Sequence, residues 1–192
     1  MDLKKGLSYV ATGFLFTLVN INLTFPRGTV NVTPDFIGWI LLFLSFRLLG
    51  SYTEGKKYLR VISLIMMILS AAMWVMSIAK PELAVTAVKI VAGVLNAVYM
   101  FALFGCLERV AADHAPEKEP ALRTLKILNL VLDIALFAVS LLASRLQPAV
   151  LVTAVTVLGI AALITAIVIA VTLYKLKKNV TEKLGKEEEA FE

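Results

Sequence analysis

The chain has 192 residues, of which 59% are hydrophobic and 17% are charged, and its mean hydropathy is +0.86. A domain of this size cannot bury that much apolar surface in its own core, so the composition excludes an ordinary soluble protein and predicts a membrane protein whose main partner is the lipid bilayer. The net charge of +5 comes from basic residues that flank apolar segments, which argues against nucleic acid as a partner.

Apolar stretches of about 20 residues recur along the chain, and this is the length that an α-helix needs to cross roughly 30 Å of hydrocarbon. They predict an all-α bundle of six transmembrane helices that forms a single domain over residues 1–178. A charged cytoplasmic tail, 179–192, is expected to follow as frayed helix or disorder. The expected helices cover about 7–25, 34–49, 58–78, 83–107, 122–143 and 148–174.

Prolines mark the expected start of every second helix. Thr33, Pro34 and Asp35 form a strong start signal, because threonine can cap a helix, proline fits its first turn and aspartate complements the positive end of its dipole. Pro81 and Pro148 hold the equivalent places in the later helix pairs. The sequence therefore predicts three helical hairpins.

The second and third hairpins resemble each other in sequence. Residues 123–132 repeat the basic and apolar pattern of 57–66 at an offset of 66 residues, and Pro148 follows Pro81 at an offset of 67. This similarity predicts parallel hairpin repeats, with the first hairpin as a more diverged copy. Chance similarity between apolar segments is the alternative.

The distribution of lysine and arginine predicts the orientation of the bundle. With the N-terminus inside, fifteen of the nineteen basic residues fall on the cytoplasmic side, Arg27, Lys80 and Arg145 fall outside, and Lys89 lies within an expected helix. This bias predicts that both termini are cytoplasmic. It also favours six spans over five, since an odd number would leave the basic tail outside. The polar segment 108–119, which contains the single histidine, then becomes the longest internal loop.

Polar and small side chains align on single faces of four expected helices when they are plotted at the 100° helical step. One interpretation is close helix packing with hydrogen bonds between helices. The other is a polar cavity or path through the bundle. In chain order the residues are Gly13, Thr17, Asn20 and Thr24; Ser63, Ser70 and Ser77; Thr86, Lys89, Gly93 and Asn96; and Asn129, Asp133, Ser140 and Ser144.

The candidate intramembrane polar site consists of Lys89, Asn96, Asn129 and Asp133. A charged group in the middle of a transmembrane helix costs several kcal/mol unless it is paired or hydrated, so such groups tend to mark function. By the helical rise, Lys89 and Asp133 differ in depth by about 5 Å, which a lysine side chain can span to form an ion pair. Lys89 can equally extend to the outer surface, which would leave Asp133 with the two asparagines.

A candidate outer mouth lies near the outer ends of the first two expected helices and comprises Asn20, Asn22, Arg27 and Asp35. The simpler interpretation of Asp35 is a helix-start residue that needs no further function. Trp39 is expected to belong to the aromatic belt at the membrane interface.

No enzymatic constellation is recognisable in the sequence. One histidine and one cysteine, His114 and Cys106, cannot form a multi-ligand metal site or a catalytic dyad within the membrane. We therefore expect no enzyme, no cofactor and no metal site. The favoured function is a small-solute or ion transporter or channel-like protein. The alternative is a non-transporting accessory or scaffold subunit, with a second copy or other membrane subunits as partners.

The segment Asn31-Val-Thr-Pro-Asp-Phe-Ile-Gly-Trp-Ile-Leu opens the second expected helix. It resembles the PDFIG-type start of the second helix in small multi-pass membrane proteins of Gram-positive bacteria. The resemblance covers the first two helices and implies a bacterial plasma membrane. It implies no activity and no site residue.

Overall fold

The computed structural model describes residues 2–18, 22–25, 28–31, 35–55, 57–79, 82–143 and 145–189. The fold is all-α, as predicted, with six helices: α1 (Asp2–Leu18), α2 (Asp35–Leu48), α3 (Lys57–Ala79), α4 (Glu82–His114), α5 (Glu119–Leu142) and α6 (Pro148–Glu189). The short 3-10 helices η1 (Gly50–Thr53) and η2 (Pro116–Lys118) lie in two of the turns. A hairpin of β1 (Asn22–Phe25) and β2 (Gly28–Asn31) lies between α1 and α2.

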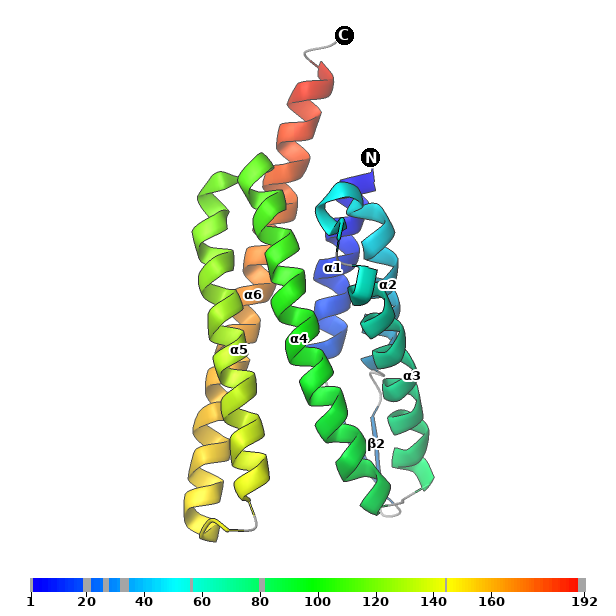
Figure 1. Cartoon of the computed structure of the whole chain (residues 1–192), viewed down its shortest axis with the longest axis vertical. Coiled ribbons are helices and arrows are strands. Elements are labelled where there is room, and N and C mark those ends of the chain that lie inside the picture. Colours follow the sequence, from blue (N-terminus) through cyan, green and yellow to red (C-terminus); the bar gives the residue numbers. More distant parts are fainter. Residues whose placement is uncertain are drawn as a thin grey trace.

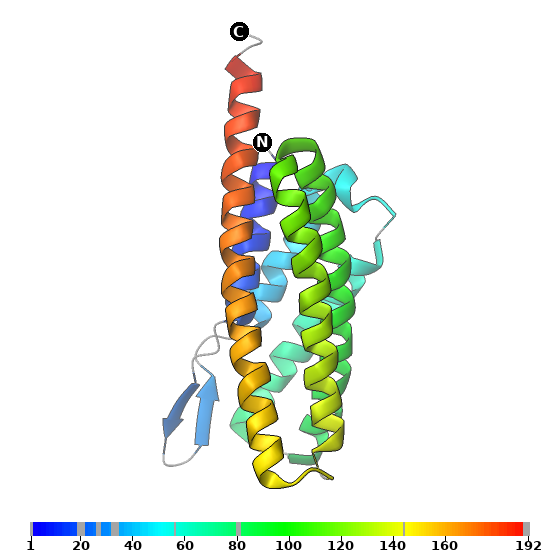
Figure 2. The same ribbon diagram turned by 90° about the vertical axis from the view of Figure 1, so that its left-hand side faces the viewer.

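Helices that follow each other in the chain pack against each other, and α6 returns to pack on α1, so the six helices form a closed circuit (Figures 1 and 2). Both termini lie at the same end of the bundle (Figure 1). Helix α4 crosses the bundle diagonally, from beside α5 at this end to beside α3 at the other (Figure 1). Because of this tilt, α4 and α5 diverge toward the end remote from the termini.

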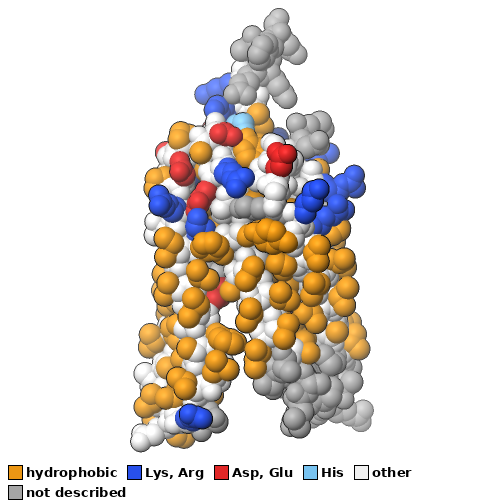
Figure 3. Space-filling view, in the orientation of Figure 1, with side chains coloured by type: hydrophobic (Ala, Val, Ile, Leu, Met, Phe, Trp, Pro, Cys, Tyr) orange, Lys and Arg blue, Asp and Glu red, His pale blue; other side chains and the backbone are white. Residues whose placement is uncertain are grey.

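Four helical segments are long and apolar enough to cross a membrane: Lys57–Val75, Ile90–His114, Pro116–Leu142 and Pro148–Lys186. Only 11% of the most apolar stretch of Pro116–Leu142, and 17% of that of Pro148–Lys186, is buried. Most of the apolar surface of α5 and α6 therefore faces outward. Figure 3 shows apolar side chains over the middle of the molecule, whereas charged side chains gather at the end that carries the termini. A soluble protein rarely exposes such a surface, and lipid is the solvent that matches it.

Helices α1 and α2 are shorter, with 17 and 14 residues, or about 26 and 21 Å at the helical rise. A role for them as membrane spans therefore stays a prediction. The first helix was expected to reach residue 25, but it ends at Leu18, and 22–25 form β1 instead. Asparagine and threonine are poor helix formers, and the β-branched Thr24 gains Thr29 as its partner across the hairpin. Figure 2 shows this hairpin beside the helices.

Two helices extend beyond their expected ends. Helix α4 continues to His114, which shortens the loop expected at 108–119 to the few residues around η2. Helix α6 continues through the segment expected to be a frayed tail and ends at Glu189. The tail is charged, but it carries an apolar stripe at i, i+3, i+7 and i+11 that continues the buried face of α6. The stripe consists of Leu173, Leu176 and Val180, which are buried, and Leu184, which packs against the core.

Polar contacts fasten this α6 extension to its neighbours. The Asn179 amide donates to the Glu117 carboxylate in η2, and Lys183 Nζ donates to the Asp113 carbonyl oxygen at 2.6 Å. Lys177 Nζ is 3.1 Å from Ser8 Oγ in α1. These contacts explain how a segment of low hydrophobicity stays helical in the bundle.

An aromatic cluster joins α2 to α4. Tyr99 is fully buried, and its ring centroid lies 5.0 Å from that of Trp39 and 6.1 Å from that of Phe46. The prediction of an interfacial Trp39 is therefore wrong, because this side chain is only 3% exposed. Trp39 lies on the buried face of α2 together with Gly38, Leu42, Ser45 and Phe46.

Glycines bring α1 and α2 into close contact. A Cβ atom built on Gly38 would lie 2.6 Å from the Gly13 carbonyl oxygen, and one built on Gly13 would lie 2.8 Å from the Gly38 carbonyl oxygen. The two backbones can approach this closely only because neither residue has a side chain. Gly13 and Thr17 belong to the polar face expected in the first helix, and the structure uses both residues to pack α1 against α2.

Candidate functional site

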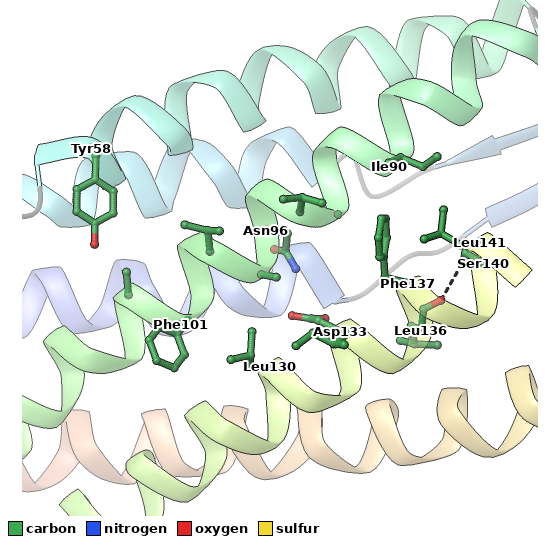
Figure 4. Close-up of a pocket in the computed structure, with 16 residues that line it drawn as sticks. Tyr58, Ile90, Asn96, Phe101, Leu130, Asp133, Leu136, Phe137, Ser140 and Leu141 are labelled. Carbon is green, nitrogen blue, oxygen red and sulfur yellow. Dashed lines mark hydrogen bonds between the residues drawn. The ribbon is translucent and has the colours of Figure 1, made fainter.

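A cavity of about 710 Å³ lies between α4 and α5, in the region where the two helices diverge (Figure 4). Its walls are mostly apolar and aromatic, and its polar side chains include Asn96, Asp133 and Ser140. A smaller cavity of about 150 Å³ is lined by residues of α1, α4, α5 and α6 and also contains Asn96 and Asp133. These two residues therefore lie at the boundary between both cavities.

The Asp133 carboxylate is held by its own helix. Asn129, one turn earlier on α5, donates from Nδ2 to Asp133 Oδ2 at 2.9 Å. Figure 4 shows the Asp133 carboxylate and the Asn96 amide approaching each other from α5 and α4. The structure thus brings together three residues of the predicted polar site, Asn96, Asn129 and Asp133, in the smaller cavity.

Gly93 and Ser140 extend the same polar faces into the larger cavity. A Cβ atom built on Gly93 would meet no other atom within 4 Å, so this position is open space. Ser140 Oγ donates to the Leu136 carbonyl oxygen at 2.8 Å, within its own helix (Figure 4). The polar faces of α4 and α5 consequently meet across a cavity and not through a close-packed contact.

The fourth residue of the predicted site is Lys89, whose side chain lies outside the described residues. Its backbone belongs to α4, seven residues before Asn96, or about 10 Å along the helix. The described hydrogen-bond partner of Asp133 is Asn129. An ion pair between Lys89 and Asp133 therefore stays a prediction.

The predicted outer mouth is described only in part. Asn20 and Arg27 lie outside the described residues, and of Asn22 only the backbone in β1 is described. Asp35 begins α2 and is half-buried, as a helix-start residue can be. Neither cavity around Asp133 includes Asp35, so the mouth also stays a prediction.

Aromatic residues of the cavity wall were not predicted as part of the site. Phe137 lies four residues after Asp133, a spacing that places it on the same face of α5. Phe101 and Tyr58 line the end of the cavity nearest the termini (Figure 4). No local pattern in the sequence indicates that Tyr58, which comes from α3, lines a cavity between α4 and α5.

A second group of polar side chains lies near the turns at the end that carries the termini. Lys126 Nζ is 2.7 Å from Glu108 Oε1 and 5.2 Å from the centre of the Phe101 ring. Tyr52 Oη is 2.9 Å from His114 Nε2, which links η1 to the end of α4. Partial burial, and then the nearby Asp113 carboxylate, raise the pKa of Tyr52 above its ordinary value. These contacts fix the turns and the end of the cavity.

Within the described part of the chain, no group of three or more histidine, cysteine, aspartate or glutamate residues could hold a metal ion. No protein-family model, no curated protein and no solved structure matches this chain. The likeness of the segment 31–41 to Gram-positive membrane proteins thus rests on one motif.

The predicted coupling between Lys89 and Asp133 can be measured directly. We expect Lys89→Met and Asp133→Asn each to destabilise the protein, and the double variant to be more stable than the sum of the two effects by about 1–3 kcal/mol. The reason is that a single charge left in a low-dielectric environment is costly, whereas a neutral pair is not. Thermal unfolding of the wild-type chain, the two single variants and the double variant in one detergent measures this coupling energy. Strictly additive effects would show that Lys89 extends to the surface instead.

Proposed function

We propose that this chain is a small transporter or channel-like protein that passes a small solute or ion through the cavity around Asn96 and Asp133. The observation that carries the proposal is a cavity of about 710 Å³ with a carboxylate in its wall, located in the apolar part of the molecule. Small-molecule sites typically measure about 300–1,000 Å³. Ionisable residues at membrane depth are costly, and they commonly lie on substrate or ion pathways.

The tilt of α4 supports a route with two differently shaped ends. Toward the termini, α4 and α5 stay together. Phe101 lines the cavity there, and Lys126, which pairs with Glu108, lies against the Phe101 ring. Toward the other end, the helices separate (Figure 1). In this proposal the conformation described is open away from the termini, and passage requires the Glu108–Lys126 end to open.

The proposal includes a bacterial plasma membrane with six spans and both termini in the cytoplasm. The gathering of charged side chains at the end with the termini supports this orientation, since cytoplasmic loops carry an excess of lysine and arginine (Figure 3). In this arrangement α1 and α2, with the hairpin between them, cross as the first pair.

Cysteine labelling tests this topology. Cys106 is the single cysteine of the chain, so a Cys106→Ser background carries no thiol that could be labelled. We expect single cysteines on the outer side of the membrane to react with an impermeant reagent in intact cells, and those on the cytoplasmic side to react only after lysis. The outer positions are Gly28, Lys80 and Gln147, and the cytoplasmic positions are Arg60, His114 and Lys186. An inversion at Gly28 alone would show that the first helix pair does not cross.

A scaffold function is the second candidate, and the close packing of the other half of the bundle favours it. Gly13 and Gly38 bring two backbones into contact, and the Tyr99 cluster fills the space between α2 and α4. A scaffold would need this rigid half but would have no use for the empty volume around Asp133. Filling the cavity therefore separates the two functions.

Gly93→Leu is the variant that fills it, because the added side chain meets open space in the cavity wall. Gly159→Leu is the matched control, since a Cβ atom built on this α6 glycine also meets no atom within 4 Å and the residue lines neither cavity. We expect both variants to fold, and each removes a helix-interior glycine, which is worth about 1 kcal/mol in helix propensity.

Thermal unfolding of purified protein against panels of metabolites and ions is the measurement. A solute present at 100 times its Kd stabilises the native state by about 2.7 kcal/mol. For the solute that binds the wild-type chain, we expect the stabilisation to persist in Gly159→Leu and to be lost in Gly93→Leu and Asp133→Asn. A solute that stabilises all four proteins equally would contradict the proposed site. A panel without any hit would leave the scaffold as the better account.

A further inference from the structure

The charge of the cavity wall has a single sign in the described residues. Of the side chains that line the larger cavity, Asp133 is the charged one, and the smaller cavity adds no second charge. Asn129 donates to one oxygen of this carboxylate, while the carboxylate faces the cavity together with Asn96 (Figure 4). In a low-dielectric environment a negative charge favours a positively charged partner. A cationic occupant of the cavity would therefore compete with the predicted ion pair to Lys89 for this carboxylate.

The rest of the wall is suited to apolar substituents on that occupant. The lining runs on α4 from Ile90 to Ala102 and on α5 from Leu130 to Leu141, or about 17 Å along each helix. Asp133 lies within this length, so apolar wall continues on both sides of the carboxylate. Phe137 adds an aromatic ring whose face attracts cations, whereas the Phe101 ring already has Lys126 Nζ 5.2 Å from its centre.

An inorganic cation fits this wall poorly. Hard divalent cations such as Ca²⁺ take about six to eight oxygen ligands, and even Mg²⁺ needs an octahedral set. The side chains of Tyr58, Asn96, Asp133 and Ser140 together bring five oxygen atoms to the lining, which is fewer than either set requires. A bare metal ion would therefore lose more hydration than the cavity can replace.

The cavity is also accessible from the side that lipid covers. Residues of its rim are strongly exposed in the isolated protein: Val94 and Val98 on α4 are 48% and 47% exposed, and Ile134 and Leu141 on α5 are 58% and 57% exposed. Figure 3 shows the gap between the two halves of the molecule from this side. An occupant that first partitions into the bilayer can therefore reach Asp133 laterally.

We infer that the cavity binds an organic cation with apolar substituents, held by the Asp133 carboxylate and taken from the lipid phase. This inference rests on the proposed function and specifies its substrate class. A lipid acyl chain is the competing occupant, but it would leave the carboxylate without a counter-charge.

Tetraphenylphosphonium is the probe, because it is a permanent cation with apolar groups on all sides, and tetraphenylborate is an anion of nearly the same shape. Equilibrium binding is measured on the full chain in nanodiscs, with empty nanodiscs subtracted for partitioning into lipid. We expect saturable binding of tetraphenylphosphonium to the wild-type chain and to Gly159→Leu. Binding should weaken at least tenfold in Asp133→Asn and in Gly93→Leu. Tetraphenylborate should not bind saturably to any of them.

The outcomes separate the inference from the function on which it rests. Equal binding of tetraphenylphosphonium to Asp133→Asn, or saturable binding of tetraphenylborate, overturns the inference. If tetraphenylphosphonium fails but another solute binds in a manner that depends on Asp133 and Gly93, the inference falls and the proposed function stands. If lipid alone occupies the cavity, in the wild-type chain and in Asp133→Asn alike, both the inference and the proposed function are wrong.

Discussion

Replacing Gly38 by leucine is expected to abolish the accumulation of folded protein. The first side-chain atom would lie 2.6 Å from the Gly13 carbonyl oxygen and 3.0 Å from the Thr17 backbone nitrogen, and neither is the end of a flexible side chain. Helices α1 and α2 would have to move apart, which we expect to cost about 3 kcal/mol or more. The smaller Gly38→Ala should also destabilise the protein, because the clash begins at Cβ.

The measurement is the yield of monodisperse protein in size-exclusion chromatography after detergent extraction. Gly93→Leu and Gly159→Leu serve as controls, since a Cβ atom at either position meets nothing within 4 Å. They add the same side chain to a helical glycine without a clash. A normal yield of Gly38→Leu would show that α1 and α2 do not pack through these glycines.

Tyr99→Ala is the second variant with a large expected effect. Tyr99 is fully buried against Trp39 and Phe46, so its truncation leaves a cavity between α2 and α4 and should cost about 3–5 kcal/mol. Tyr99→Phe is the matched control. The hydroxyl is buried without a hydrogen-bond partner among the described residues, so its removal should be neutral or slightly stabilising.

Thermal unfolding in detergent distinguishes the two Tyr99 variants. The expected pattern is a large fall in the melting temperature for alanine and little change for phenylalanine. If phenylalanine destabilised the protein as strongly as alanine, the hydroxyl would have to make an essential hydrogen bond. The packing of the Tyr99 ring against Trp39 and Phe46 would then contribute little to the stability of the protein.

Much of the helical framework could be predicted from local signals. The bounds of α2 and α3 agree with the expected ones within one residue at each end, because proline, aspartate and glycine mark the ends of uniformly apolar stretches. The 100° step also placed Asn96 and Asp133 on faces that meet. These features depend on residues close together in the sequence.

The features that could not be predicted depend on contacts between distant residues. Trp39 was expected at the interface, and nothing near it in the sequence indicates that Tyr99, on another helix, encloses it. The cavity itself exists because α4 is tilted away from α5, and no local pattern specifies that tilt (Figure 1). The tail was judged by its charge, although the spacing of Leu176, Val180 and Leu184 indicated a continuing buried face.

The continuous α6 has a mechanical consequence for a protein that changes shape in the membrane. Its 42 residues correspond to about 63 Å, roughly twice the thickness of the hydrocarbon layer. The later part of this helix stays within the bundle, because Leu176 and Val180 are buried and Leu184 packs against the core. Asn179 and Lys183 tie it to η2 and to the end of α4. Earlier in the same helix, Ala162 and Ala166 line the smaller cavity together with Asp133. A shift of α6 beside Asp133 would therefore also move the α4–α5 turn, at the end of the bundle that carries the termini.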